Sequence, residues 1–182
     1  MPIEDILSRA QRLDPAALTE IHDRYYPEVY RYISYRLGDE HACEDIAAEV
    51  FLRLLDALHK KRGPAQNLRG WLYGTASNLV NDHLRGRYAR KVDSLDMDDN
   101  GLPDGSHLER SYEEEWVQQQ VVQALQELTP EQQHVLALRF SDERSLEETA
   151  SILGKSVTAV KGLQFRAIAT LKRILEDRIK DQ

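Results

Sequence analysis

The sequence lacks the residues on which most secreted and metal-binding folds depend. Its 182 residues include one cysteine, Cys43, so no internal disulfide can form and a thiolate zinc cage has no second sulfur donor. No apolar run reaches the ~20 residues that span a bilayer, and the start MPIEDILSRA has neither the basic residues nor the apolar core of a signal peptide. We therefore expect a cytoplasmic protein that is stabilised by packing alone.

Charge is distributed unevenly along the chain. The net charge of −7 argues against nucleic-acid binding until it is divided among segments. Residues 1–92 carry 14 basic and 13 acidic side chains, residues 93–118 carry one and nine, and residues 119–182 carry nine of each. Residues 60–91 alone hold eight bases against one acid. These counts predict a basic surface followed by an acidic segment.

Apolar residues recur at helical spacing through almost all of the chain, and no alternating strand pattern occurs, so the predicted fold class is all-α. Asp14-Pro15 should cap and start one helix, which Pro27 should bend or divide. Asp39 should cap a second helix, and a third should begin near Asn67. The second helix has two adjacent apolar rows, one of Ile46, Val50, Leu54 and Leu58 and the other of Ala47, Phe51 and Leu55.

Residues 93–111 interrupt this pattern. They are rich in Asp, Gly and Ser, a composition that cannot bury a core. We therefore predict a flexible acidic linker that joins two small helical domains, residues 1–92 and residues 112–182. Because the linker repels phosphate, we expect it to weaken DNA binding by the free protein.

The second predicted domain contains the plan of a helix-turn-helix. Ser145 and Glu148 form a capping box, Gly154 ends the short helix, and Ser156 caps a long final helix. The alternative is an ordinary helical hairpin with a solvated face. In the helix-turn-helix interpretation, the residues that face DNA are Ser156, Thr158, Lys161, Phe165 and Arg166.

The third predicted helix combines amides, arginines and aromatic rings. Such a mixture suits partly melted DNA, because amides pair with base edges, guanidinium groups bind phosphates and rings stack on unpaired bases. The alternative is that Trp71 and Tyr73 belong to the core and that the bases are a solvated helix end. The candidate DNA-binding residues are Arg69, Asn78, Asn81, Arg85, Arg87 and Tyr88.

Three segments resemble those of one family, in the right order. EDIAAEVFLRLLDAL at 44–58, LRGWLYGTASNLVNDHLRGR at 68–87 and SLEETASILGKSVTAVKGLQFRAIATLKR at 145–173 are similar to the polymerase-binding helix, the minus-10 helix and the minus-35 helix-turn-helix of the extracytoplasmic-function sigma factors. The resemblance spans nearly the whole chain. It implies a sigma-70-type sigma factor that binds core RNA polymerase and directs promoter recognition, DNA melting and transcription initiation.

The resemblance also implies roles for individual positions. The asparagine at position 78 and its neighbours would hold flipped bases of the minus-10 element, and the linker would pass through the polymerase cleft. Family members are often held inactive by an anti-sigma factor. Leu163 and Ile168 stand where the family has arginines, which implies fewer phosphate contacts at the minus-35 element. The residues implicated in binding the clamp of the largest polymerase subunit are Asp45, Glu49, Phe51, Leu52 and Arg53.

The same residues leave two other classes of function open. A free-standing helix-turn-helix regulator would dimerise on a palindrome without polymerase, and a protein-interaction module would use the basic helix to dock an acidic partner. An enzyme is not expected, because the histidines are scattered and no phosphate-binding glycine loop or nucleophile elbow is present. No catalytic residue, metal ligand or cofactor is therefore predicted.

Overall fold

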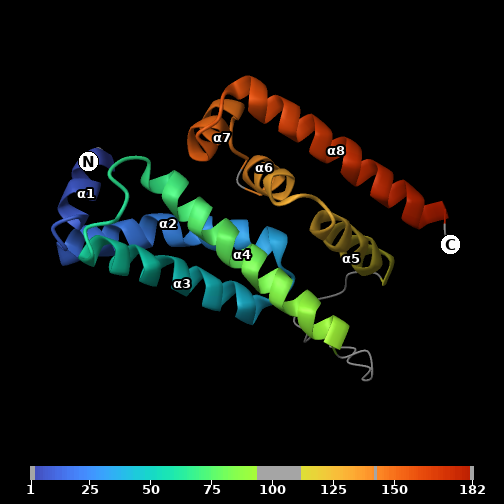
Figure 1. The fold of residues 1–182 in the computed structure, drawn as a ribbon, viewed down its shortest axis with the longest axis horizontal. Coiled ribbons are helices and arrows are strands. Elements are labelled where there is room, and N and C mark those ends of the chain that lie inside the picture. Colours follow the sequence, from blue (N-terminus) through green and yellow to red (C-terminus); the bar gives the residue numbers. More distant parts are fainter. Residues whose placement is uncertain (1–2, 94–111, 142, 181–182) are drawn as a thin grey trace.

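The computed structural model describes residues 3–93, 112–141 and 143–180, and these residues form helices joined by short loops (Figure 1). The predicted linker, 93–111, lies outside the described residues except for Asp93, so the domain boundaries stay predictions. No helix in the described ranges is long and apolar enough to cross a membrane. The helices are α1 (Ile3–Ala10), α2 (Pro15–Arg36), α3 (Glu40–His59), α4 (Leu68–Asp93), α5 (Tyr112–Gln126), α6 (Pro130–Phe140), α7 (Leu146–Leu153) and α8 (Val157–Lys180).

Helices α1 to α4, here called the first half, surround one apolar core. The expected faces of α2, α3 and α4 are buried there, with Tyr25, Tyr32 and Tyr73 among the largest fully buried side chains. The rings of Tyr32 and Tyr73 meet edge to face, with centroids 5.2 Å apart. Helix α1 was not predicted from the sequence; it adds Ile6 and Leu7 to this core.

The predicted helix starts are confirmed. Asp14 and Asp39 accept hydrogen bonds from backbone amides in the first turns of α2 and α3, and Asn67 does the same for Gly70 in α4. Helix α2 runs through Pro27 without dividing. Pro27 lies on the exposed side of α2, where water can satisfy the carbonyl that proline leaves without a donor, while the buried residues on either side hold the helix together.

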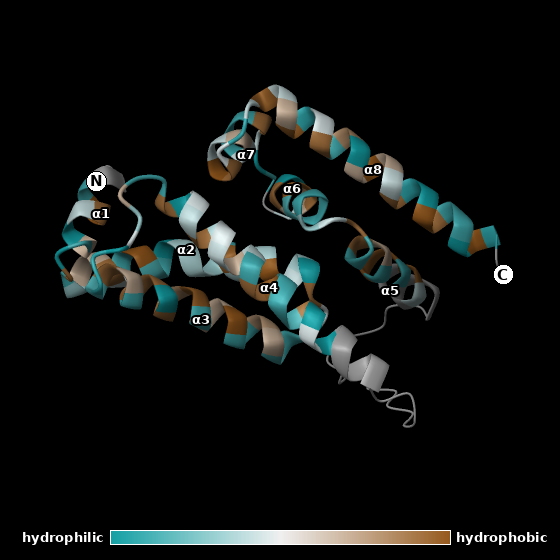
Figure 2. Ribbon diagram, viewed as in Figure 1, coloured by the Kyte–Doolittle hydropathy of each residue, from teal (hydrophilic) through white to brown (hydrophobic). Residues whose placement is uncertain are grey.

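Helices α5 to α8, here called the second half, form a smaller core. Capping boxes start α6 at Thr129 and α7 at Ser145, and Gly154 ends α7 with φ +62°, a conformation that glycine adopts without strain. Val160, Leu163 and Ala167 of α8 are buried against the other helices of this half. Figure 2 shows that α8 carries hydrophobic as well as hydrophilic bands along its length.

The two halves pack against each other, which the sequence did not reveal. Ala137 and Leu138 of α6 and Ile152 of α7 are buried in the core of the first half. Helices α6 and α7 therefore lie between α8 and the first half, and α8 faces outward (Figure 1).

Candidate nucleic-acid interface

Helix α4 exposes one polar face. Asn78 is exposed, and Arg85 follows two turns later with a side chain that is 76% exposed. Seven residues at about 100° each return almost to the same side of a helix, so the amide and the guanidinium share one face. Arg85 is paired with Asp82 at 2.5 Å, an exposed ion pair of little net strength. This face can offer both an amide and a cation to a ligand.

Asn81 lies beside that face, but its side chain is hydrogen-bonded to a residue of another helix. Its side-chain oxygen accepts a hydrogen bond from the guanidinium of Arg36, the last residue of α2. Ser77, one turn earlier on α4, is buried and accepts from the same guanidinium at 3.1 Å. The structure thus brings Asn78 and Asn81 together, but it gives only Asn78 a freely exposed amide.

Arg69 lies elsewhere on α4. It is nine residues before Asn78, so at about 100° per residue it points to the opposite side of the helix. Its guanidinium pairs with Glu28 of α2 at 3.1 Å and lies 5.4 Å from the centre of the Tyr25 ring. The structure therefore assigns Arg69 to contacts within the protein and separates it from the other minus-10 candidates.

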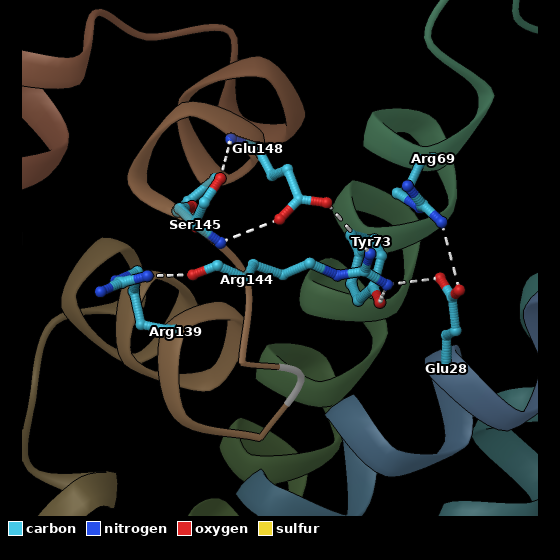
Figure 3. A network of polar contacts seen from close by, with 8 residues as sticks. Glu28, Arg69, Tyr73, Arg139, Arg144, Ser145 and Glu148 are labelled. Atoms are coloured by element: carbon cyan, nitrogen blue, oxygen red, sulfur yellow. Dashed lines mark hydrogen bonds and ion pairs between the residues drawn. The ribbon is translucent and has the colours of Figure 1, made fainter.

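Glu28 also joins the two halves of the molecule, as Figure 3 shows. Its other carboxylate oxygen pairs at 2.7 Å with Arg144, which precedes α7 and has a side chain only 12% exposed. Arg144 also donates to the Tyr73 hydroxyl at 3.4 Å. One carboxylate thus pairs with a guanidinium from α4 and with another from the second half. Because these pairs are partly buried, removing one partner would leave a poorly solvated charge on the other.

The remaining candidates of α4 lie near its end. Arg87 is exposed, and Tyr88 lies beyond the side chains that the structure describes. The alternative interpretation of the aromatic residues is confirmed for Tyr73, which is fully buried, and Trp71 packs partly buried against the same core. The Tyr73 ring is therefore not available for stacking on a base in this arrangement.

The helix-turn-helix has the predicted local chemistry. Ser145 Oγ accepts from the Glu148 amide at 3.0 Å, and Glu148 accepts from the Ser145 amide at 2.9 Å. The hydrogen bonds from Ser145 lower the pKa of the Glu148 carboxyl, with a further contribution from nearby Arg144. Ser156 Oγ accepts from the Ala159 amide at 3.2 Å and so starts α8. These bonds fix the residues at which α7 and α8 begin.

Helix α8 presents all five of its predicted residues to solvent: Ser156, Thr158, Lys161, Phe165 and Arg166 are exposed. Phe165 is 75% exposed, which is costly for an aromatic ring without a partner. Of the two positions that lack family arginines, Leu163 is buried in the core and Ile168 is 43% exposed. Only Ile168 therefore lies where an arginine could reach a phosphate.

Helix α3 has a mixed exposed face. Asp45 and Arg53 are exposed, and Arg53 pairs with Glu49 at 2.8 Å. Leu52 is 59% exposed, and Leu55, which was expected in a buried row, is 42% exposed beside it.

Phe51 of α3 belongs to the core instead. It is 8% exposed, and its ring lies 5.0 Å from that of His22 and 5.9 Å from that of Tyr26. The exposed apolar surface of α3 is therefore formed by Leu52 and Leu55, without Phe51.

The sequence did not predict the polar residues that form contacts between the two halves. Arg36, Glu28 and Arg144 read as ordinary surface charges in helical segments, and no local pattern distinguishes them. The described residues contain no cluster of histidine, cysteine and carboxylate side chains that could hold a metal ion.

Each half of the chain matches a model of a known protein family. Residues 21–90 match the model "Sigma-70 region 2" and residues 124–173 match the model "Sigma-70, region 4", so the two matches cover most of the chain. The first match contains the exposed faces of α3 and α4, and the second contains the helix-turn-helix.

Curated relatives extend the match to almost the whole chain. The sequence is 34% identical over 177 residues to the ECF RNA polymerase sigma factor BldN of Streptomyces coelicolor, with 95% of this chain and 66% of BldN covered. It is 29% identical over 161 residues to the ECF RNA polymerase sigma factor SigX of Bacillus subtilis, with 86% of this chain and 82% of SigX covered. This chain thus spans just under two thirds of BldN and most of SigX.

Solved structures share the fold. CnrH, determined in complex with the cytosolic domain of CnrY, superimposes with a TM-score of 0.64 at 22% identity, covering 96% of this chain and 97% of CnrH. RpoE of Bartonella quintana, determined with the anti-sigma factor NepR, superimposes with a TM-score of 0.56 at 18% identity, covering 87% and 96%. At these identities the likeness concerns the fold alone.

Proposed function

The chain belongs to the extracytoplasmic-function sigma factors of the sigma-70 family, and from this membership we propose which of its faces bind polymerase, melted DNA and duplex DNA. A sigma factor is a subunit of RNA polymerase that directs initiation, and the family is not catalytic by itself. We propose the same for this chain, with core polymerase and promoter DNA as partners and the cytoplasm as its location.

The observation that carries the assignment is the separation of three exposed faces on three helices. Helix α4 exposes Asn78 and Arg85, α8 exposes five polar and aromatic residues at its start, and α3 exposes Leu52 and Leu55 among charges. We assign these faces to the minus-10 element, the minus-35 element and the polymerase clamp respectively. A free-standing regulator is not favoured, because both halves match models of sigma-70 regions and the curated relatives are sigma factors.

Asn81, Arg85 and Arg87 complete the proposed minus-10 site around Asn78, and Tyr88 would extend it toward the end of α4. We do not assign Arg69 a direct DNA contact, because its guanidinium already pairs with Glu28 and lies against the Tyr25 ring. At the clamp we retain Asp45, Glu49, Leu52 and Arg53 and add Leu55, whose exposed apolar surface continues that of Leu52.

Run-off transcription with core polymerase on a set of candidate promoters tests the proposal. We expect Leu52→Glu to abolish complex formation with core, because it places a charge in the apolar part of the clamp face. Asn78→Ala should leave core binding intact and weaken open-complex formation more than closed-complex formation, since the amide acts only on flipped bases. A wild-type chain that forms no complex with core polymerase would refute the sigma assignment.

We propose that the acidic linker restrains DNA binding until polymerase sequesters it. Residues 93–118 carry nine acidic side chains against one basic, and they directly follow the basic end of α4. Deleting residues 93–111 should therefore tighten binding of the free protein to promoter duplex, most strongly at low salt. Equal affinities for the intact and shortened chains, measured by fluorescence anisotropy across a salt series, would contradict this role.

An anti-sigma factor is a further proposed partner. The Bartonella RpoE structure contains such a factor, and this chain shares the fold. Phe165 and Ile168 leave apolar surface exposed on α8, and a partner that covered them would gain buried area. A partner bound to this surface should compete with minus-35 duplex DNA for α8, which fluorescence anisotropy with a labelled duplex measures.

A further inference from the structure

Arg36 is buried, and among the described residues no carboxylate forms an ion pair with its guanidinium. The residue is 4% exposed, and its guanidinium donates to the Tyr32 hydroxyl and the Ser77 hydroxyl, each at 3.1 Å, and to the amide oxygens of Asn81 and Gln133. All four acceptors are neutral. Within the described ranges, its Nε is covered and has no hydrogen-bond acceptor. Buried arginines are usually paired with an anion, so this site has an unused capacity for one.

The acceptors of Arg36 come from both halves of the molecule. Tyr32, Ser77 and Asn81 belong to α2 and α4, whereas Gln133 belongs to α6. Gln133 is fastened to its own half, because its Nε2 donates to the carbonyl oxygens of Gln126 at 3.2 Å and Leu128 at 2.9 Å. If the second half moves away, Gln133 leaves with it. Arg36 then keeps three acceptors from the first half and becomes accessible to solvent.

The uncovered guanidinium would lie within the proposed minus-10 site. Ser77 and Asn81, which both contact it, flank Asn78 along α4. A planar guanidinium with a free N–H donor binds phosphate well, and phosphate contacts fix the position of a strand whose bases are read by neighbouring amides. Arg36 is thus placed to hold the backbone of the strand whose base Asn78 contacts.

We propose that Arg36 is a phosphate-binding residue of the minus-10 site that the docked second half keeps covered, so that docking of α6 on α2 and binding of a DNA phosphate at Arg36 exclude each other. This inference rests on the proposed function, because it assumes that the face around Asn78 binds DNA. It adds a ligand contact from α2 and makes separation of the halves a condition for full affinity. The apparent affinity of the free chain for single-stranded DNA then equals the affinity of the open form multiplied by the fraction of molecules that are open.

Arg144→Ala provides an opened protein in which Arg36 is intact. The substitution removes the ion pair with Glu28 and the bond to Tyr73, while Glu28 keeps Arg69 as its partner. The full-length variant should bind a fluorescein-labelled single-stranded DNA of mixed sequence about five- to tenfold more tightly than the wild type, despite losing a positive charge. Affinity that is unchanged or weaker would overturn the mutual exclusion.

Arg36→Gln in the Arg144→Ala background tests the phosphate contact. Between about 50 and 200 mM salt, the slope of log affinity against log salt concentration should fall by about 0.7, the loss expected for one phosphate contact on a single strand. Arg36→Lys should keep the slope, because it keeps the charge although it loses the planar fork. The matched control is Arg12→Gln, an exposed arginine in the turn after α1, which should leave the slope unchanged.

Thermal melting of each variant separates this role from a structural one. A purely structural Arg36 predicts that the Gln and Lys variants lose stability and DNA affinity alike, with equal salt slopes, and that result would overturn the proposal. A salt slope that stays the same in both the Gln and the Lys variants would also overturn the proposal. Binding of each variant to core polymerase is measured in parallel, because loss of the core complex in the wild type refutes the sigma assignment itself, whereas a failed Arg36 test with core binding intact refutes only this inference.

Discussion

Acidification should separate the two halves of the protein through His134. Its ring lies 5.4 Å from that of Tyr32 across the contact between α6 and α2, and its Nε2 is covered without a hydrogen-bond partner in the described residues. Burial, together with the nearby positive charge of Arg36, lowers the pKa of His134 from 6.5 to about 3. The docked state therefore holds His134 neutral.

The sign and size of the effect follow from proton linkage. The undocked His134 should titrate near its ordinary pKa of 6.5, so the undocked state binds more protons wherever the pH lies between about 3 and 6.5. Docking is fully favoured above that window and is lost as the pH falls through it. From pH 7 to pH 5 the free energy of docking should fall by about 2 kcal/mol, or about 25-fold in the equilibrium constant. Carboxylates with ordinary pKa values stay mostly ionised over this range.

Fluorescence energy transfer across the two halves measures this equilibrium. Dyes are placed on cysteines that replace the exposed Lys60 of the first half and Lys172 of α8, in a Cys43→Ala background, and docking is titrated with urea at each pH. His134→Gln is the control, because glutamine cannot take up a proton. The reasoning is refuted if the wild type shows no loss of docking between pH 7 and pH 5, or if the Gln variant shows the same loss.

Two further predictions concern local packing. At Gly70 a Cβ atom would lie 2.7 Å from Cγ of the capping Asn67 and 2.8 Å from the carbonyl oxygen of Ile152 in α7, so Gly70→Ala should cost about 1–3 kcal/mol. Gly74→Ala, with no atom within 4 Å, should be neutral or slightly stabilising in the same denaturant titrations. Equal effects at the two glycines would contradict the close approach of α4 and α7. Ser145→Ala removes one side of a capping box and should lower the free energy of unfolding by about 1 kcal/mol; no change would mean that α7 does not depend on its cap.

Much of the fold was predictable because its signals are local. Caps at Asp14, Asp39 and Ser145 act within one helical turn, and the chain carries the residues that form those bonds next to the helices they start. The apolar spacing of α2, α3, α4 and α8 predicted most of their buried residues, and the αL turn at Gly154 needs only that glycine. The exposed residues at the start of α8 followed from the same spacing.

The tertiary structure decided which charged residues are free to bind a ligand. Arg69 and Arg85 look alike in the sequence. In the structure, Arg69 forms an ion pair with Glu28 of another helix, whereas the Arg85 side chain is exposed. Phe51 is core and Leu55 is surface, although both lie on one predicted row. Arg36 meets Gln133 across 97 residues of sequence, and no helical period relates the two. The sequence by itself thus determined most of the helices, their caps and the family, because these depend on neighbours along the chain. Docking of the halves depends on contacts between distant segments, so only the tertiary structure decided which side chains it covers.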